Sequence, residues 1–200
     1  MTWYVVDGMD GSGKSTVGDL INDRLGERGR RVMYVTHPNS DCFWGRQELK
    51  FLHIDSTPAT IMVIILYIID VVCSLFRAKR HRKDYDDFVF VRYIMAVSYL
   101  PEGMVRKGYL IISKILPMPD VKIFVDVDGA TAMARIEARS EDREAFEEVG
   151  KLDKVRRKMQ MLTDDGWYTV DNMKSPEHTA EQVDAILEKE RQNEGSYSPF

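Results

Sequence analysis

Short apolar runs alternate along the chain with longer segments of helical periodicity. The runs are rich in β-branched and aromatic residues, as buried strands are. They are WYVV at 3–6, RVMYV at 31–35, FVFV at 88–91, VKIFVDV at 121–127 and WYTV at 167–170. After the first run, Val17, Leu20, Ile21 and Leu25 recur at helical spacing. This alternation predicts an α/β fold with a central parallel sheet of about five strands, flanked by helices.

One apolar segment is too long for a strand. Residues 60–76 read TIMVIILYIIDVVCSLF and are followed by the basic stretch RAKRHRK, which resembles a membrane span with a positive flank. The run is shorter than the roughly 20 residues that a bilayer requires, and Asp70 within it would cost about 3 kcal/mol on insertion scales. We therefore interpret it as a helix apolar on all sides, buried between the sheet and a second helix layer.

Composition agrees with a compact intracellular protein. The chain has 200 residues with 44% hydrophobic content, which predicts a single domain over 1–190 and a flexible tail at 191–200. The net charge of -4 argues against a nucleic-acid partner. Cys42 and Cys73 match no zinc spacing, and no basic, apolar leader precedes the first strand, so we expect a cytoplasmic location.

The segment DGMDGSGKST at 7–16 carries the strongest chemical signal. From Gly8 to Ser15 it matches the phosphate-binding pattern G-x-x-x-x-G-K-[ST], between a predicted strand and a predicted helix. The glycines let backbone N–H groups approach phosphate oxygens, Lys14 neutralises the β- and γ-phosphates, and Ser15 ligates Mg²⁺. The segment predicts a site for ATP or GTP made by Gly8, Asp10, Gly11, Ser12, Gly13, Lys14, Ser15 and Thr16. Because parallel strands end at one edge, the loops after Val35, Val91 and Val127 should surround it.

Three arginines suggest what happens to the terminal phosphate. Arg135, Arg139 and Arg143 are spaced four residues apart and would share one face of a continuous helix. Such groups stabilise the charge of a phosphoryl-transfer transition state and can contribute about 10³ to 10⁵ in rate. The alternative is a solvated helix edge, in which neighbouring glutamates pair with the arginines.

These segments together resemble the thymidylate kinase family of nucleoside monophosphate kinases. The likeness rests on four segments in order: VVDGMDGSGKST at 5–16, PDVKIFVDVDGATAMARI at 119–136, ARSEDREAFE at 138–147 and WYTVDNMKSPEHTAEQVDAIL at 167–187. The resemblance implies ATP and Mg²⁺ as cofactors, a lid at about 138–150, a nucleotide acceptor and a homodimer. It also implies roles for Arg139 and Arg143 in catalysis.

For the acceptor, the resemblance implies contacts by Asp10 with the sugar 3′-hydroxyl, by Arg92 with the phosphate and by Tyr67 with the base. Tyr67 can equally be a core residue. Asp70 either accepts a hydrogen bond from the substrate or takes an N–H or hydroxyl partner inside the core. Lys14 and Arg92 complete the expected catalytic set with the two lid arginines.

The acceptor side also departs from the family pattern. The third strand usually ends in Asp-Arg-Tyr, whereas this chain has Val91, Arg92 and Tyr93. Metal positioning would then fall to Ser15, with Asp7 acting through water. The helix segment LYIIDVV at 66–72 offers no arginine, and THPNS at 36–40 places a histidine before its proline.

These departures leave the acceptor open among dTMP or a close analogue, another small molecule, and no acceptor at all in a noncatalytic nucleotide-binding relative. A GTPase switch is disfavoured because no guanine-binding NKxD motif is present.

Overall fold

The computed structural model describes residues 1–39, 57–138 and 148–196. Its elements are β1 (Thr2–Asp7), α1 (Lys14–Glu27), β2 (Val32–Thr36), α3 (Thr57–Arg80), β3 (Asp87–Val91), the 3₁₀ helix η1 (Met95–Tyr99), α4 (Glu102–Ile115), β4 (Val121–Asp126), α5 (Gly129–Ala138), α6 (Val149–Gln160), β5 (Tyr168–Asp171) and α7 (Pro176–Ser196). Helix α7 extends to Ser196 and so includes the first part of the tail predicted at 191–200.

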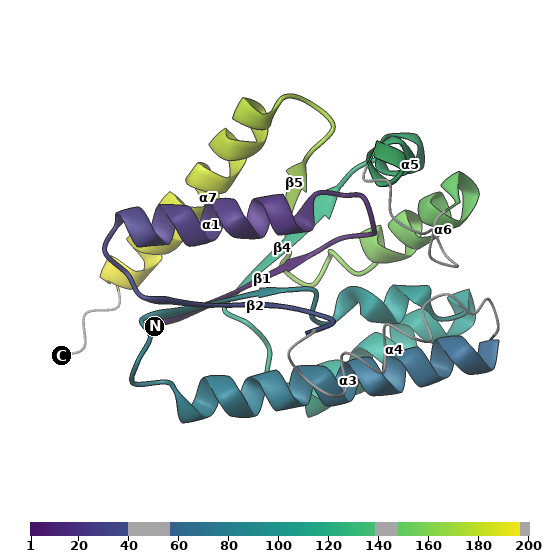
Figure 1. Cartoon of the computed structure of the whole chain (residues 1–200), viewed down its shortest axis with the longest axis horizontal. Helices are drawn as coiled ribbons and strands as arrows, with labels where there is room; N and C mark the ends of the chain where they lie inside the picture. The colour runs from purple at the N-terminus through teal and green to yellow at the C-terminus, as the bar shows by residue number, and fades with distance from the viewer. Residues whose placement is uncertain (40–56, 139–147, 197–200) are drawn as a thin grey trace.

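The five strands form one parallel sheet in the order β2-β3-β1-β4-β5 (Figure 1). The predicted α/β class and parallel sheet are therefore confirmed. The first strand of the chain lies in the middle, because β1 pairs with β3 on one side and with β4 on the other. This order brings the carboxyl ends of β1, β3 and β4 together, and the loop after β1 is the predicted phosphate loop.

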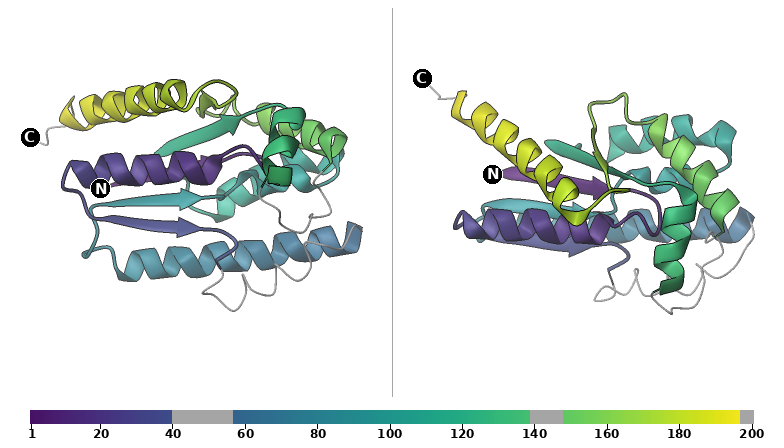
Figure 2. Two further views of the ribbon diagram at one scale, coloured as in Figure 1. Left: turned by 45° about the horizontal axis from the view of Figure 1, so that its top comes forward. Right: turned by 90° about the horizontal axis from the view of Figure 1, so that it is seen from above.

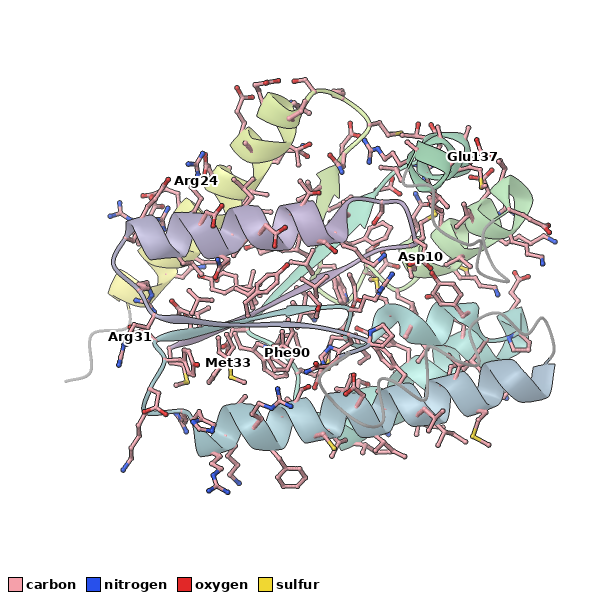
Figure 3. The ribbon with its side chains drawn as sticks, viewed as in Figure 1. Asp10, Arg24, Arg31, Met33, Phe90 and Glu137 are labelled. Atoms are coloured by element: carbon pink, nitrogen blue, oxygen red, sulfur yellow. The ribbon has the colours of Figure 1, made fainter. Side chains whose placement is uncertain are left out.

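Helices cover both faces of the sheet. Figure 1 shows α1 and α7 against one face and α3 and α4 on the other, and in the left view of Figure 2 α7 and α3 again lie on opposite sides of the strands. Under α1 and α7 the buried side chains include Val6, Val17 and Leu187. Under α3 and α4 they include Phe90 and Val71, and Phe90 lies between the sheet and α3 (Figure 3). Two apolar layers therefore hold the sheet.

Helix α3 corrects one prediction. Tyr67 and Val71 are buried against the sheet, but Phe76 is 69% exposed and Ile65 is 47% exposed. The helix thus covers the sheet with one face only, and no second layer buries the other face among the described residues. No helix within the described ranges combines the length and the apolar character that a membrane span requires.

Candidate active site

The phosphate loop joins the end of β1 to the start of α1, and its glycines are required by backbone geometry. Gly11 and Gly13 have φ angles of 75° and 87°, in the left-handed region that side chains disfavour. A Cβ atom on Gly11 would lie 2.4 Å from the carbonyl oxygen of Ala132, and one on Gly13 would lie 2.3 Å from Nδ2 of Asn172. The loop is therefore tightly enclosed by α5 and by the segment after β5.

Helix α1 begins directly after this loop. No side-chain hydrogen bond caps its N-terminus in the described chain, and no acidic residue lies in its first turn. The first N–H groups of a helix lack partners within the helix and favour an anion. Ser15 and Thr16 are exposed in this first turn, where a bound phosphate and its metal ion would meet them.

Lys14 is the first residue of α1 and is buried. Its Nζ donates hydrogen bonds to the carbonyl oxygen of Met9 at 2.8 Å and to Oδ1 of Asp10 at 3.2 Å. Burial, helped by the nearby charge of Arg92, lowers the pKa of Lys14 to about 8, although Asp10 and Asp7 oppose this shift. Phosphate oxygens at this point would favour the charged ammonium.

Asp10 gathers three side chains from separate elements. It lies in the turn between β1 and α1 (Figure 3) and accepts hydrogen bonds from Lys14, Arg92 and the Tyr99 hydroxyl. Burial alone would raise the pKa of Asp10, but the charges of Lys14 and Arg92 outweigh it and hold this pKa well below its usual range. Two cations around one carboxylate leave a net positive charge, which suits phosphate groups. No motif or periodicity in the sequence pointed to Tyr99.

Asp7 has partners other than a metal. Its oxygens accept backbone N–H bonds from Tyr93 at 3.0 Å, Ile94 at 3.1 Å and Met95 at 3.2 Å, and the carboxylate is fully buried. Burial raises its pKa, and these three bonds partly offset the shift. Asp7 thus fixes the loop after β3. These bonds are compatible with a contact to Mg²⁺ through water, so the metal roles of Ser15 and Asp7 stay predictions.

Arg92 begins the loop after β3 with a φ angle of 65°, an unfavourable value for a residue with a side chain. Besides its bond to Asp10, its Nη1 donates to the carbonyl oxygen of His37 at 3.1 Å. The preceding Val91 is buried and points toward α1, where a Cβ atom on Gly18 would lie 2.6 Å from it. An apolar contact therefore occupies the position of the family carboxylate.

The structure assigns Tyr67 and Asp70 to protein contacts. The Tyr67 hydroxyl donates to the carbonyl oxygen of Tyr93 at 2.8 Å, and its ring is part of the core. Oδ2 of Asp70 accepts the N–H of Asn39 at 2.7 Å. Within the described residues, Oδ1 of Asp70 is buried without a hydrogen-bond partner, so both roles considered for Asp70 stay predictions.

Arg135 contacts the phosphate loop and the segment after β5. Its guanidinium donates to the carbonyl oxygens of Ser12 at 3.3 Å and Asn172 at 2.8 Å. Nδ2 of Asn172 also donates to the carbonyl oxygen of Ser12 at 2.8 Å, and Oδ1 of Asn172 accepts from Thr179 at 2.8 Å. Nothing in the sequence pattern singled out Asn172. The predicted catalytic residues Arg139 and Arg143 lie outside the described residues.

A preformed metal cage is not part of the described structure. In residues 1–39, 57–138 and 148–196, no group of three or more His, Cys, Asp or Glu side chains could hold a metal ion. Mg²⁺ commonly keeps several waters and binds through few protein groups together with substrate phosphates. The exposed Ser15 hydroxyl at the start of α1 fits that form of binding.

Comparisons with known proteins agree on one family. A family model described as thymidylate kinase matches residues 6–183. The thymidylate kinase of Leptospira borgpetersenii is 26% identical, and the match covers 90% of each chain. A probable thymidylate kinase of Pyrobaculum calidifontis is 29% identical over 94% of this chain and 96% of that protein. The solved structure of Candida albicans thymidylate kinase superposes with a TM-score of 0.69 at 17% identity, covering 95% of this chain and 92% of that one, and supports the fold.

Proposed function

Because the chain belongs to the thymidylate kinase family, we propose that it transfers the γ-phosphoryl group of ATP to dTMP or a close analogue. An oxygen of the acceptor phosphate forms a bond to the γ-phosphorus, the bond to the β–γ bridging oxygen breaks, and ADP leaves. Family membership confirms the prediction of an ATP-dependent nucleotide kinase. Among the described residues, the observation that carries the mechanism is the cluster of Lys14, Asp10 and Arg92 at the carboxyl edge of the sheet.

The two cations of this cluster come from different elements and would bind different substrates. Lys14 belongs to the phosphate loop and would bind the β- and γ-phosphates of the donor, while Arg92 comes from the loop after β3 and would bind the acceptor phosphate. Asp10 contacts both cations and fixes their separation. Its carboxylate is also the group that we propose for the acceptor sugar hydroxyl. Arg139 and Arg143 remain our candidates for stabilising the transferred group.

Mg²⁺ is the metal that we propose, held by Ser15 and the ATP phosphates. When bound, it neutralises charge on the β- and γ-oxygens. On the protein side, Ser15 supplies one hydroxyl at the start of α1. Lys14 and the first N–H groups of α1 supply donors for the remaining negative charge of the phosphates.

The acceptor pocket supports recognition of phosphate more directly than recognition of thymine. Arg92 is the acceptor-side cation that contacts Asp10, whereas Tyr67, which the resemblance places at the base, donates its hydroxyl to the carbonyl oxygen of Tyr93. A kinase of another small-molecule acceptor is therefore the alternative that an acceptor panel has to test.

An acceptor panel tests the proposed reaction. ADP formation from Mg-ATP is measured without acceptor and with dTMP, other nucleoside monophosphates, nucleosides and small alcohols. We expect dTMP or a close nucleotide to stimulate ADP formation, and Lys14→Met to abolish it while circular dichroism stays unchanged. Equal ADP formation with and without every acceptor would exclude a nucleotide kinase, and ATP binding without turnover would refute the proposed transfer.

A homodimer through α3 and α4 is a further part of this proposal. Both helices expose large apolar side chains: Met62, Ile65 and Phe76 on α3, and Met104, Leu110, Ile111 and Ile115 on α4. Surfaces of this kind mark protein interfaces. Phe76→Glu with Ile115→Glu should convert a dimer into a monomer in analytical ultracentrifugation, whereas Met161→Glu, an exposed apolar position directly after α6, should not. A wild-type monomer at micromolar concentration would refute the dimer.

A cytoplasmic location completes the proposal, because the ATP donor is present there. Cell fractionation tests it, and recovery of the protein outside the cytoplasmic fraction would refute it.

A further inference from the structure

His37 and Arg92 are joined by reciprocal hydrogen bonds, and a third bond lies beside them. The backbone N–H of His37 donates to the carbonyl oxygen of Val91 at 3.0 Å. Nδ1 of His37 lies 2.9 Å from the carbonyl oxygen of Arg92, and Nη1 of Arg92 donates to the carbonyl oxygen of His37 at 3.1 Å. These bonds connect the end of β2 to the end of β3, across 55 positions of sequence.

The contact with Arg92 determines where the imidazole carries its proton. A carbonyl oxygen only accepts hydrogen bonds, so Nδ1 must be the N–H donor. Burial lowers the pKa of His37, although nearby Asp70 opposes the shift, and this keeps the ring neutral with a lone pair on Nε2. The ring is 1% exposed, and its centroid lies 5.6 Å from that of Phe90 and 6.0 Å from that of Tyr67. The imidazole therefore has one fixed orientation.

The backbone of Arg92 needs such a support. Its φ angle of 65° is sparsely populated by residues with a Cβ atom and persists only where surrounding contacts determine it. The N–H of Arg92 donates to the carbonyl oxygen of Val6 at 2.9 Å, while His37 binds the carbonyl oxygen on the other side. Both polar groups of this residue are thus held, and its guanidinium is directed to Asp10.

Helix α3 supports His37 in turn. Oδ2 of Asp70 accepts the N–H of Asn39, two residues after His37. The segment that carries the imidazole is thereby fixed at one end by β3 and at the other by α3.

We propose that His37 is a positioning residue for Arg92. Its Nδ1–H holds the Arg92 carbonyl, and so keeps the guanidinium at Asp10, in place to bind the acceptor phosphate. The inference rests on the proposed function, because it gives Arg92 the acceptor as its ligand. It adds a role for a histidine that the family pattern does not supply.

Two variants of similar size separate the hydrogen bond from packing. His37→Asn keeps an N–H donor at the position of Nδ1, whereas His37→Leu has a similar size and no donor. Both lose the same ring contacts, so a purely structural role predicts equal effects. We expect kcat/KM for the acceptor to be about tenfold lower in His37→Leu than in His37→Asn, as one hydrogen bond allows. The KM for ATP should agree within about twofold.

The same pair in an Arg92→Ala background tests whether His37 acts through Arg92. We expect the tenfold difference to disappear there, measured as single turnover with excess enzyme. Equal acceptor kcat/KM for the asparagine and leucine variants would overturn the inference. So would a tenfold difference that persists without the Arg92 side chain.

A measurement without substrate separates this inference from the proposed reaction. Long-range ¹H–¹⁵N spectra of the wild-type protein should show His37 with a proton on Nδ1 and none on Nε2, assigned by the signal that His37→Asn removes. A proton on Nε2 alone would overturn the inference even if the enzyme phosphorylates dTMP. If no acceptor supports turnover, the proposed reaction fails, and the tautomer alone decides whether His37 holds Arg92.

Discussion

Replacing Gly13 by alanine should lower the free energy of unfolding, because the new Cβ atom strains the backbone and displaces the side chain of Asn172. An alanine at its φ of 87° costs about 1–2 kcal/mol. The new Cβ would also meet Nδ2 of Asn172 at 2.3 Å, which displaces that side chain from Ser12 and Thr179. Each lost hydrogen bond adds about 1 kcal/mol, while the stiffer unfolded chain returns about 0.4–1 kcal/mol. We therefore expect a net loss of about 3 kcal/mol in the free energy of unfolding.

Gly29 is the matched control, because its φ is 74° but a Cβ atom at this position would meet no described atom within 4 Å beyond its chain neighbours. Gly29→Ala should cost only about 1 kcal/mol, from backbone strain less the unfolded-state gain. Urea unfolding followed by circular dichroism measures both values. In an Asn172→Ala background the cost of Gly13→Ala should fall to that of Gly29→Ala. Equal costs in the wild-type background would show that the contact with Asn172 does not restrict the loop.

Three further predictions concern charged groups. Since burial lowers the pKa of Lys14 to about 8, kcat/KM for ATP should fall above pH 8 as the ammonium loses its proton; a profile flat to about pH 10 would contradict this. Asp7→Asn places an amide N–H against backbone donors and should cost about 2–3 kcal/mol in urea unfolding. Asp120→Asn is the control, because the exposed carboxylate of Asp120 accepts the backbone N–H of Trp3. This variant should cost less than about 1 kcal/mol. Equal losses in the two variants would refute the role of Asp7 in holding the loop after β3. Replacing Arg139 or Arg143 by alanine should lower kcat at least tenfold with ATP binding nearly unchanged, whereas two wild-type kcat values would return both arginines to the solvated helix edge.

Local patterns predicted the strands well. The run VKIFVDV at 121–127 became β4 at Val121–Asp126, and FVFV at 88–91 became β3 at Asp87–Val91. Such runs are determined by neighbouring residues, and the phosphate loop by a fixed spacing of glycines, lysine and serine. The prediction that α3 is buried on both sides was wrong, because a helix with apolar residues on all sides does not reveal which face the sheet covers.

The rest of the site depends on residues far apart in the chain. The bond between Tyr99 and Asp10 spans 89 positions, and that between Asn172 and Ser12 spans 160. Hydrophobic periodicity contains no information about such pairs, because each partner is an ordinary polar residue within its own segment. His37 illustrates the limit: its sequence neighbours identify a departure from the family, but only the fold brings its ring to the carbonyl oxygen of Arg92.

The central place of β1 has a consequence for synthesis on the ribosome. This first strand pairs with Asp87–Val91 on one side and with Val121–Asp126 on the other. At roughly 5–20 residues per second, the second partner is completed about 6–25 s after β1 has been made. During that interval the apolar strand and the glycine loop behind it have no completed sheet to join. A nascent chain that ends before β4 also lacks Ala132 and Asn172, which enclose the phosphate loop, so we expect ATP to stabilise the chain through this site only after these residues have been made.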